Sequence, residues 1–312
     1  MIKNAKLIHM TNFFIRQKFI DERLDKYLVA RLRLSRNQVQ KLIKQHQITV
    51  NDRLPSVHQF LRSGDKISIN QPATAQTDNS VKTVPKIIKT TADYYIINKP
   101  AGLLVHPTAK GETDTLLDWL LAFDPKLKTV GDDPNRPALI HRLDKEVSGL
   151  MIIPRHLDAF DHFKKLFKTR AIHKTYVALV HGTIAAESGI INFPITRSKS
   201  GLYVASPQNS ATGQSAETRF KVTKRFDHHT LLEINPKTGR TNQIRVHLNA
   251  IDHPIVGDPL YTNAKIKPQY NFNLDRVFLH AAELNFVDLN QQSVSVKSTL
   301  PKNLQTILES LD

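Results

Sequence analysis

The stretch ALIHRLDKEVSGLMIIPR, residues 138–155, bears on both the fold and the chemistry of this chain. One acid, Asp144, stands between two bases, Arg142 and Lys145, and a Ser-Gly pair and an apolar run follow. Nearby opposite charges favour the ionised form of a carboxyl group. We therefore predict a low pKa for Asp144 and a carboxylate available as a nucleophile or a base. An ion pair within a loop explains the same residues equally well.

Short apolar runs and helical patterns surround this stretch from Pro85 onward. We expect strands in DYYIINK (93–99), HKTYVALVHG (173–182), AETRFKV (216–222), HTLLEI (229–234) and DRVFLHAAELNF (275–286). We expect helices in TLLDWLLAF (115–123), AFDHFKKLFK (159–168) and TNQIRVHLNA (241–250). Strands with interspersed helices, rather than strict alternation, predict an α+β fold with a mixed or antiparallel sheet.

A smaller unit is expected over residues 21–69. Leu24, Leu28 and Leu32 recur at helical spacing and predict one amphipathic helix. A second helix is expected to open at Ser35, because Gln38 three residues later completes a capping-box pattern. Short strands are expected in ITV and KISI, which turn-forming residues bound on either side. Together these elements predict a small α/β domain of two helices and two strands.

Basic residues concentrate around the two predicted helices of this unit. Arg36, Lys41 and Lys44 lie on or beside the polar face of the second helix, where they could contact RNA phosphates. A solvated helix face is the plainer interpretation. Residues 70–84 lack apolar periodicity and predict a linker, so we expect the larger domain to occupy 85–312.

The composition favours a polyanionic partner. Lys and Arg number 44 against 28 Asp and Glu, a formal net charge of +16. Such a field favours nucleic acid over an acidic metabolite. The absence of Cys excludes thiol nucleophiles, disulfides and thiolate zinc sites. Because we find neither an apolar run of about 20 residues nor a signal-peptide core, we expect a cytoplasmic protein without a membrane partner.

Several stretches resemble the RluA-type pseudouridine synthases. HRLDKEVSGL (141–150) resembles the catalytic motif of that family, in which the Asp is essential. The family's other blocks have counterparts, in order, in IINKPAGLLVHP (96–107), HKTYVALVHG (173–182), KTGRTNQIRVHL (237–248) and HPIVGDPLY (253–261). RLDKYLVARLRLSRNQVQKLIKQHQITVN (23–51) resembles an S4 RNA-binding domain. The likeness extends over about residues 21–290.

The resemblance implies a role for five residues. Asp144 would be the catalytic carboxylate, and Arg245 the basic residue that pairs with it. Tyr176 would stack on the uracil and take part in proton transfer. Arg142 would help to open the RNA and occupy the space of the flipped nucleotide, and Leu150 would help to line the pocket.

The chain departs from the family's usual text at three positions. Val147 stands where Thr is common, Pro154 where Ala is common, and Asn242 where His is common. None of these replaces the proposed carboxylate, its basic partner or the tyrosine. We expect Asn242 to contact the RNA, because its amide can still donate a hydrogen bond.

The implied reaction converts uridine to pseudouridine by breaking N1–C1′ and joining C5 to C1′. It needs no redox partner, so we expect no cofactor and no metal, although His247 and His253 invite a metal interpretation. The carboxylate could attack C1′ of the ribose or C6 of the uracil, or remove a ribose proton. We expect a monomer that acts on structured RNA. Of the possible substrates, we favour large-subunit ribosomal RNA. The alternatives are transfer RNA and a non-catalytic RNA-binding assembly factor.

Overall fold

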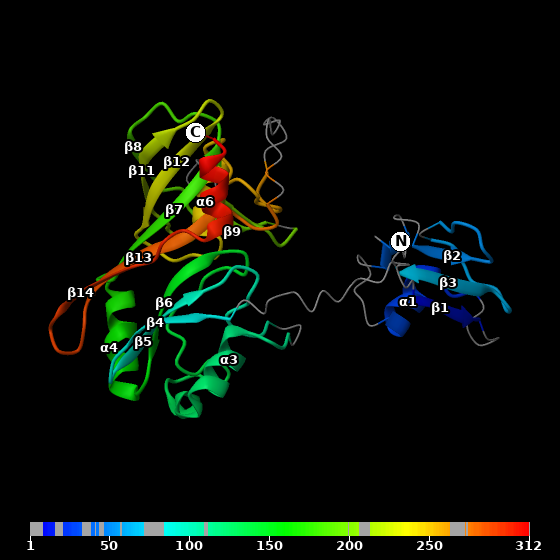
Figure 1. Ribbon diagram of the computed structural model, residues 1–312, viewed down its shortest axis with the longest axis horizontal. Coiled ribbons are helices and arrows are strands. Elements are labelled where there is room, and N and C mark those ends of the chain that lie inside the picture. Colours follow the sequence, from blue (N-terminus) through cyan, green and yellow to red (C-terminus); the bar gives the residue numbers. More distant parts are fainter. Residues whose placement is uncertain are drawn as a thin grey trace, which may run out of the picture. The chain divides into compact units, whose positions relative to one another are not determined.

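The chain forms two compact units, residues 1–82 and 83–312, each of which is described by itself (Figure 1). The computed structural model describes residues 9–15, 21–32, 39–40, 42–43, 47–56, 58–71, 84–108, 112–198, 200–205, 213–262, 272 and 274–311. Within those ranges no helix has the length and apolar character needed to cross a membrane.

The described residues of the smaller unit form a three-stranded antiparallel sheet and helix α1, and residues 39–40 and 42–43 are helical as well. The strands lie in the order β1-β3-β2. Their bounds are β1 (His9–Phe14), β2 (Ile48–Val50) and β3 (Lys66–Gln71), and the helix is α1 (Leu24–Leu32). Leu24 and Leu28 are fully buried in the core of this unit, which confirms the first predicted helix. The two short strands are also present, but β1 precedes the region in which we expected the unit to begin.

Some sequence predictions fall outside the described residues. These are the positions Arg36, Lys41 and Lys44 and most of the predicted linker, residues 72–83.

The larger unit contains a nine-stranded sheet with the order β4-β5-β6-β13-β7-β12-β11-β8, and β14 pairs with β13. The strands are β4 (Lys86–Thr90), β5 (Tyr94–Lys99), β6 (Ser148–Pro154), β7 (His173–His181), β8 (Ser188–Ile191), β11 (Thr218–Arg225), β12 (His229–Pro236), β13 (Leu279–Val287) and β14 (Ser293–Lys297). The pair β6–β13 is parallel and the other described pairs are antiparallel. The predicted α+β fold with a mixed sheet is confirmed.

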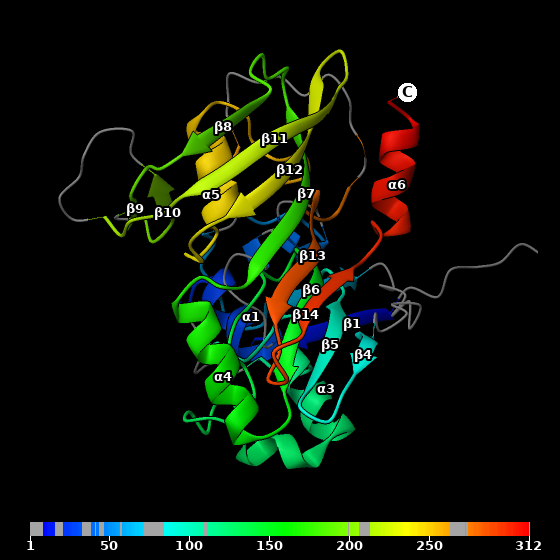
Figure 2. The ribbon, with the colours of Figure 1, turned by 90° about the vertical axis from the view of Figure 1, so that its left-hand side faces the viewer.

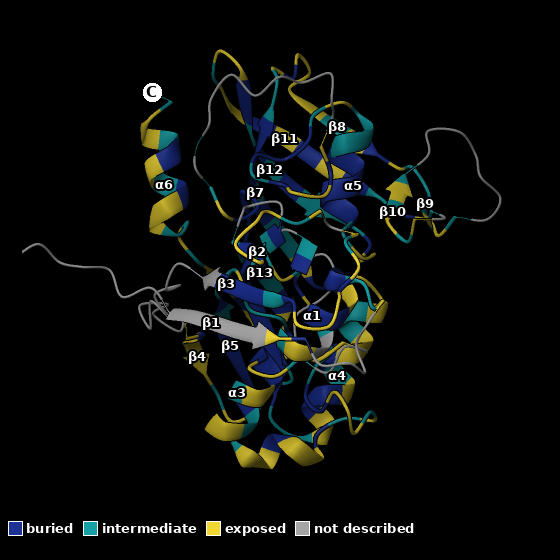
Figure 3. Cartoon of the chain, turned by 90° about the vertical axis from the view of Figure 1, so that its right-hand side faces the viewer, coloured by how far each residue is buried: buried dark blue, intermediate teal, exposed yellow. Residues whose placement is uncertain are grey.

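Helices pack against this sheet at both ends of its strand order (Figure 2). They are α3 (Leu116–Phe123), the 3-10 helix η2 (Pro125–Thr129), α4 (Leu157–Lys168), α5 (Gln243–Ala250) and α6 (Lys302–Glu309). Helix α4 contacts β6, whereas α5 contacts β11 and the short strand β10 (Tyr203–Ala205), which pairs with β9 (Ile195–Arg197). Figure 3 shows one buried stripe along α6, which Leu304 and Ile307 form.

Strand β6 follows the Asp144 loop directly and is buried along its whole length. Met151 and Ile153 enter the main hydrophobic core, whereas Leu150 and Ile152 enter a second core that includes residues of α4. Because neighbouring side chains on a strand point to opposite faces, β6 anchors the loop between two apolar layers. The Asp144 loop therefore ends on a rigid support.

Gly149 lets β6 and β13 lie side by side. Its φ is +130°, and a Cβ atom built there would lie 2.3 Å from the Ala281 carbonyl oxygen and 2.5 Å from its nitrogen. Those atoms are backbone and cannot rotate away. We expect Gly149→Ala to destabilise the larger unit by about 3 kcal/mol or more, from overpacking and backbone strain together.

Gly102→Ala is the matched control for this prediction. Gly102 also has a positive φ, +84°, but nothing lies within 4 Å of its hypothetical Cβ. It should lose only about 1–2 kcal/mol through backbone strain. Urea unfolding followed by tryptophan fluorescence measures both variants, and equal losses would show that the β6–β13 approach contributes nothing.

Candidate active site

Asp144 lies on the loop that enters β6, with its side chain 20% exposed. The loop closes as a turn in which the Val147 amide donates to the Asp144 carbonyl at 3.2 Å. The Lys145 carbonyl accepts from the Gly102 amide at 2.8 Å and from the Lys99 ammonium at 3.3 Å. A second loop, at the end of β5, thus holds the Asp144 loop in place.

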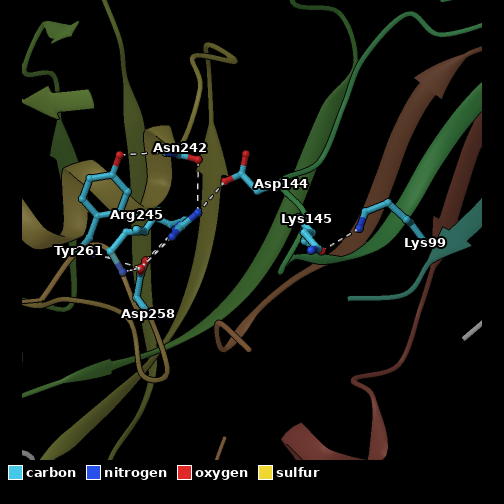
Figure 4. A network of polar contacts seen from close by, with 8 residues as sticks. Lys99, Asp144, Lys145, Asn242, Arg245, Asp258 and Tyr261 are labelled. Atoms are coloured by element: carbon cyan, nitrogen blue, oxygen red, sulfur yellow. Dashed lines mark hydrogen bonds and ion pairs between the residues drawn. The ribbon is translucent and has the colours of Figure 1, made fainter. Parts of the chain in front are cut away.

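The Lys99 ammonium joins these two loops from a fully buried position (Figure 4). It also donates to the carbonyls of Pro100 and Leu103, both at 2.8 Å. Burial and the charge of Arg276 lower the pKa of Lys99 to about 7. One of the carbonyls that Lys99 binds belongs to Lys145, the residue that follows Asp144. Lys99 therefore fixes the main chain next to the carboxylate.

Arg245, on α5, is the basic partner of Asp144. Its Nη1 lies 3.5 Å from the Asp144 carboxylate. The rest of its guanidinium forms a bidentate pair with Asp258, Nε to Oδ2 at 2.7 Å and Nη2 to Oδ1 at 2.8 Å (Figure 4). Both side chains of that pair are buried, and the amides of Leu260 and Tyr261 also donate to Asp258. Asp258 therefore orients the guanidinium that faces Asp144.

Asn242 stands before α5 with φ 55°, a left-handed conformation that Asn tolerates better than most residues. Amide oxygen and nitrogen are assigned from their partners, and an amide oxygen would repel the Asp144 carboxylate. With the NH2 group facing Asp144, it donates to the two carboxylate oxygens at 3.2 and 2.9 Å. The amide oxygen then accepts from the Tyr261 hydroxyl at 3.1 Å. In the orientation that Figure 4 draws, the amide oxygen instead accepts from Nη1 of Arg245 at 3.3 Å. In both orientations the side chain expected to contact RNA is engaged within the protein, beside Asp144.

The predicted low pKa of Asp144 is wrong in direction. Burial raises the pKa of this carboxyl above its ordinary value, and the charges of Arg245 and Arg142 offset that effect only in part. Arg142 and Lys145, the neighbours on which the prediction depended, are exposed to solvent. A carboxylate with a raised pKa is a stronger base, which suits proton abstraction and nucleophilic attack.

Tyr176, on β7, is buried at the wall of a small pocket that opens at Asp144. Burial and the charge of Asp144 raise the pKa of its phenol above the ordinary value, so the hydroxyl is protonated at neutral pH. It can therefore donate a hydrogen bond or present its ring, but it cannot serve as a base without losing that proton.

The pocket has a volume of about 100 Å³, well below the roughly 300–1,000 Å³ of sites for drug-sized ligands. Its apolar walls come from Leu143, Val147, Ile244 and Leu279. Leu150, which we expected to help line it, packs in the second core instead. The reason is strand alternation, because Leu150 points to the opposite face of β6 from Met151.

A larger groove of about 760 Å³ continues from this pocket. Eight cationic side chains and no acidic one line it: Arg136, Arg142, Lys168, Arg170, Lys174, Arg219, Lys237 and Arg240. Arg142 is exposed and borders both cavities. A charged groove of this sign raises the local concentration of a polyanion at the pocket.

Two other polar residues of the opening motif are structural. Nε2 of His141 accepts from the Ile152 amide at 2.9 Å, and its ring stacks on Phe167. The Ser148 hydroxyl lies 2.7 Å from Nδ1 of His280 and accepts from Arg276 at 2.8 Å. Among the described residues, no three His, Asp or Glu side chains gather as ligands for a metal ion.

We predict that Asn242→Asp shifts the pH dependence of the reaction. The new carboxylate would lie about as close to Asp144 as the amide does, 2.9–3.2 Å. A neighbouring like charge raises the pKa of Asp144 further, so the rate should fall at a higher pH than in the wild type and recover as the pH rises. Single-turnover rates from pH 5 to 9 measure this shift.

Asn242→Gly is the control, since Gly accepts the positive φ and brings no charge. It should lower the rate and move the profile in the same direction but less far, because it removes a hydrogen bond to the carboxylate without adding a charge. Identical profiles for Asn242→Asp and the wild type would mean that Asn242 does not contact Asp144.

Three residues of the site escaped the sequence analysis. Asp258 lies within a quoted motif, HPIVGDPLY, but its pairing with Arg245 depends on a loop that returns to α5. Tyr261 follows in the same loop. One feature of the sequence could have identified Lys99, because it is the one charged residue of the run YYIINK (94–99). An unbalanced charge in a buried strand calls for a nearby set of acceptors.

The chain is similar to known enzymes over nearly its whole length. Residues 93–250 match the family model described as RNA pseudouridylate synthase, and residues 22–67 match the S4 domain. The protein named uncharacterized RNA pseudouridine synthase YlyB, of Bacillus subtilis (strain 168), is 31% identical over 293 residues, 93% of this chain and 94% of that one. The ribosomal large subunit pseudouridine synthase D of Buchnera aphidicola subsp. Acyrthosiphon pisum (strain APS) is 33% identical over 299 residues, 92% and 94% respectively.

A solved structure agrees in fold. Human RNA Pseudouridylate Synthase Domain Containing 4 matches with a TM-score of 0.58 and 27% identity, over 72% of this chain and 92% of that one. The matched family region contains Asp144, Tyr176 and Arg245. On these matches, the chain belongs to the RNA pseudouridine synthase family, as an RluA-type enzyme that also carries an S4 domain.

Proposed function

We propose that this RNA pseudouridine synthase modifies uridines of large-subunit ribosomal RNA and that Asp144 is its catalytic carboxylate. The observation that carries the second part is the partly exposed Asp144 carboxylate, which Arg245 and Asn242 contact at the floor of a small pocket. That pocket opens into a groove lined by eight cations. A nucleotide turned out of a structured RNA could enter the pocket while its strand lies in the groove.

The substrate assignment has separate support. Relatives named ribosomal large subunit pseudouridine synthase D are 33% and 31% identical to this chain. An S4 match at residues 22–67 adds a second RNA-binding module. We propose that residues 21–69 supply affinity, that 70–84 link the domains, and that 85–312 carry out the reaction.

Each residue of the proposed site has a separate role in the reaction. Asp144 supplies the nucleophile or the base, whichever of C1′, C6 or the ribose proton it addresses. The guanidinium of Arg245 and the amide of Asn242 hold the carboxylate in one orientation. The neutral Tyr176 presents its ring to the uracil and its hydroxyl as a donor. Arg142 fills the gap that the flipped nucleotide leaves in the RNA.

Tritium release from RNA labelled at C5 of uracil tests the activity, because the C5 proton is lost when C5 joins C1′. Transcripts of large-subunit ribosomal RNA and of transfer RNA would be compared with the full chain. Release from the ribosomal transcript alone supports the proposal, and release from transfer RNA alone contradicts the substrate. Pseudouridine mapping in a strain that lacks the protein then identifies the uridine. No release from either RNA would favour an assembly factor.

A further inference from the structure

Lys174 occupies the border between the catalytic pocket and the basic groove. It lies on β7 two residues before Tyr176, so both side chains point to the same face of the sheet. Seven residues line both cavities and thus define the mouth of the pocket: Arg142, Lys174, Tyr176, Pro236, Thr238, Gly239 and Arg240. A strand that delivers its base to Asp144 must pass these residues.

Lys174 is the half-buried cation of this mouth, less exposed than Arg142 and Arg240. Arg142 and Arg240 are exposed, and Nε of Arg240 donates to the Ser215 carbonyl at 3.1 Å. The Lys174 ammonium instead lies 5.7 Å from the centre of the Phe167 ring and faces Gly239. Because Gly239 has no side chain, a ligand can approach the ammonium from that side.

Lys174 has no acidic partner within ion-pair distance in the described part of the chain, whereas two other cations of the groove do. Arg219 pairs with Glu217 at 2.8 Å, and Arg136 pairs with Asp133 at 2.8 Å. Burial lowers the pKa of Lys174, and no nearby acid offsets that effect. Enclosed charges in proteins are normally paired, so an uncompensated ammonium at a substrate mouth calls for an anion from the ligand.

We propose that Lys174 binds the phosphodiester next to the target uridine and so holds the flipped nucleotide in register with Asp144. This inference rests on the proposed RNA pseudouridine synthesis at Asp144. The pocket holds about 100 Å³ and therefore takes the base, whereas the phosphate stays at the mouth. An ammonium is a compact point charge suited to one phosphate. Lys174 is thus a substrate-positioning residue, distinct from the cations that attract the RNA along the groove.

The test compares three variants on an RNA that the wild-type enzyme modifies, labelled with tritium at C5 of uracil. Lys174→Met removes the charge and keeps an unbranched chain, and Lys174→Arg restores a cation. Lys128→Met is the matched control, because Lys128 is an exposed lysine that lines neither the groove nor the pocket. Single-turnover rates are measured at saturating enzyme, and affinity for the same RNA is measured from about 50 to 200 mM salt.

Lys174→Met should lower the saturated rate about 10- to 100-fold, because the nucleotide is no longer held in place. It should also reduce the slope of log affinity against log salt by about 0.7–0.9, the amount for one phosphate contact. Lys174→Arg should recover most of the rate. Lys128→Met should leave both the slope and the saturated rate near the wild-type values.

Two results would overturn the proposal. A saturated rate unchanged in Lys174→Met would make Lys174 one more attracting cation of the groove. A lowered rate with an unchanged salt slope would assign the ammonium to the uracil edge rather than to a phosphate. Failure of the proposed function is separate, because the wild-type enzyme would then release no tritium at all.

Discussion

Replacement of Asp144 by Asn is expected to abolish pseudouridine formation while the enzyme still folds and binds RNA. The Asn side chain has nearly the same shape, so the contacts with Arg245 and Asn242 need only small adjustments. It has neither the charge nor the basicity that each of the three possible first steps requires. We expect the single-turnover rate to fall by about 1,000-fold or more, as for the loss of other catalytic nucleophiles.

The measurement is tritium release at saturating enzyme, with circular dichroism and RNA affinity as controls for folding and binding. Asp258→Asn is a poor control because Asp258 holds Arg245. Asp132→Asn is better, because Asp132 lies on the surface, where its contact is with Lys164. It should leave the rate unchanged. A rate in Asp144→Asn within about tenfold of the wild type, 1.4 kcal/mol in barrier height, would exclude the carboxylate as the reacting group.

The pH profile of the wild type adds a second check on Asp144. The ionised form reacts, so the rate is full above the pKa of Asp144 and declines as the pH falls through it. Burial raises that pKa, so the decline should begin at a higher pH than the ordinary value of 3.8 implies. A rate that is constant down to pH 4 in the still-folded enzyme would contradict this ordering.

The sequence predicts α3, α4 and β11 well, because one side of each is exposed to solvent and the other is buried. Helices α3, α4 and α5 carry apolar residues at helical spacing, and β11 alternates buried and exposed positions. Strand β6 was not predicted as a strand, and all seven of its residues are buried. A run that is apolar on both faces has no period to detect. Leu150 was placed in the pocket by resemblance, whereas the alternation of side chains along β6 directs it into the second core.

Some residues of the site could likewise be predicted from the sequence and others could not. Asp144, Tyr176 and Arg245 were found through resemblance, although they lie on a loop, a strand and a helix far apart in sequence. Asp258 and Lys99 act on those residues rather than on substrate, and their partners are set by the tertiary fold. The direction of the Asp144 pKa was missed for a related reason. Charges adjacent in sequence point into water, whereas burial comes from distant segments.

Arg245 has two roles, pairing with the buried Asp258 and orienting Asp144. We expect its variants to separate these roles. Arg245→Met leaves the buried Asp258 without its bidentate partner and Asp144 without its cation. Loss of one member of a buried pair destabilises a protein by about 3–5 kcal/mol. We expect that loss in urea unfolding, together with a fall in the saturated single-turnover rate of about 100-fold or more, because the carboxylate is no longer oriented.

The double variant Arg245→Met with Asp258→Asn decides between a structural and a catalytic role. An amide at 258 carries no charge and can still accept from the Leu260 and Tyr261 amides, so most of the lost stability should return. The rate should stay low, because no guanidinium faces Asp144. If the rate returned together with stability, Arg245 would serve the fold alone. If RNA affinity fell while the saturated rate held in Arg245→Met, Arg245 would be a phosphate contact. The expected separation of stability from rate follows from one guanidinium whose Nε and Nη2 bind Asp258 while Nη1 faces Asp144.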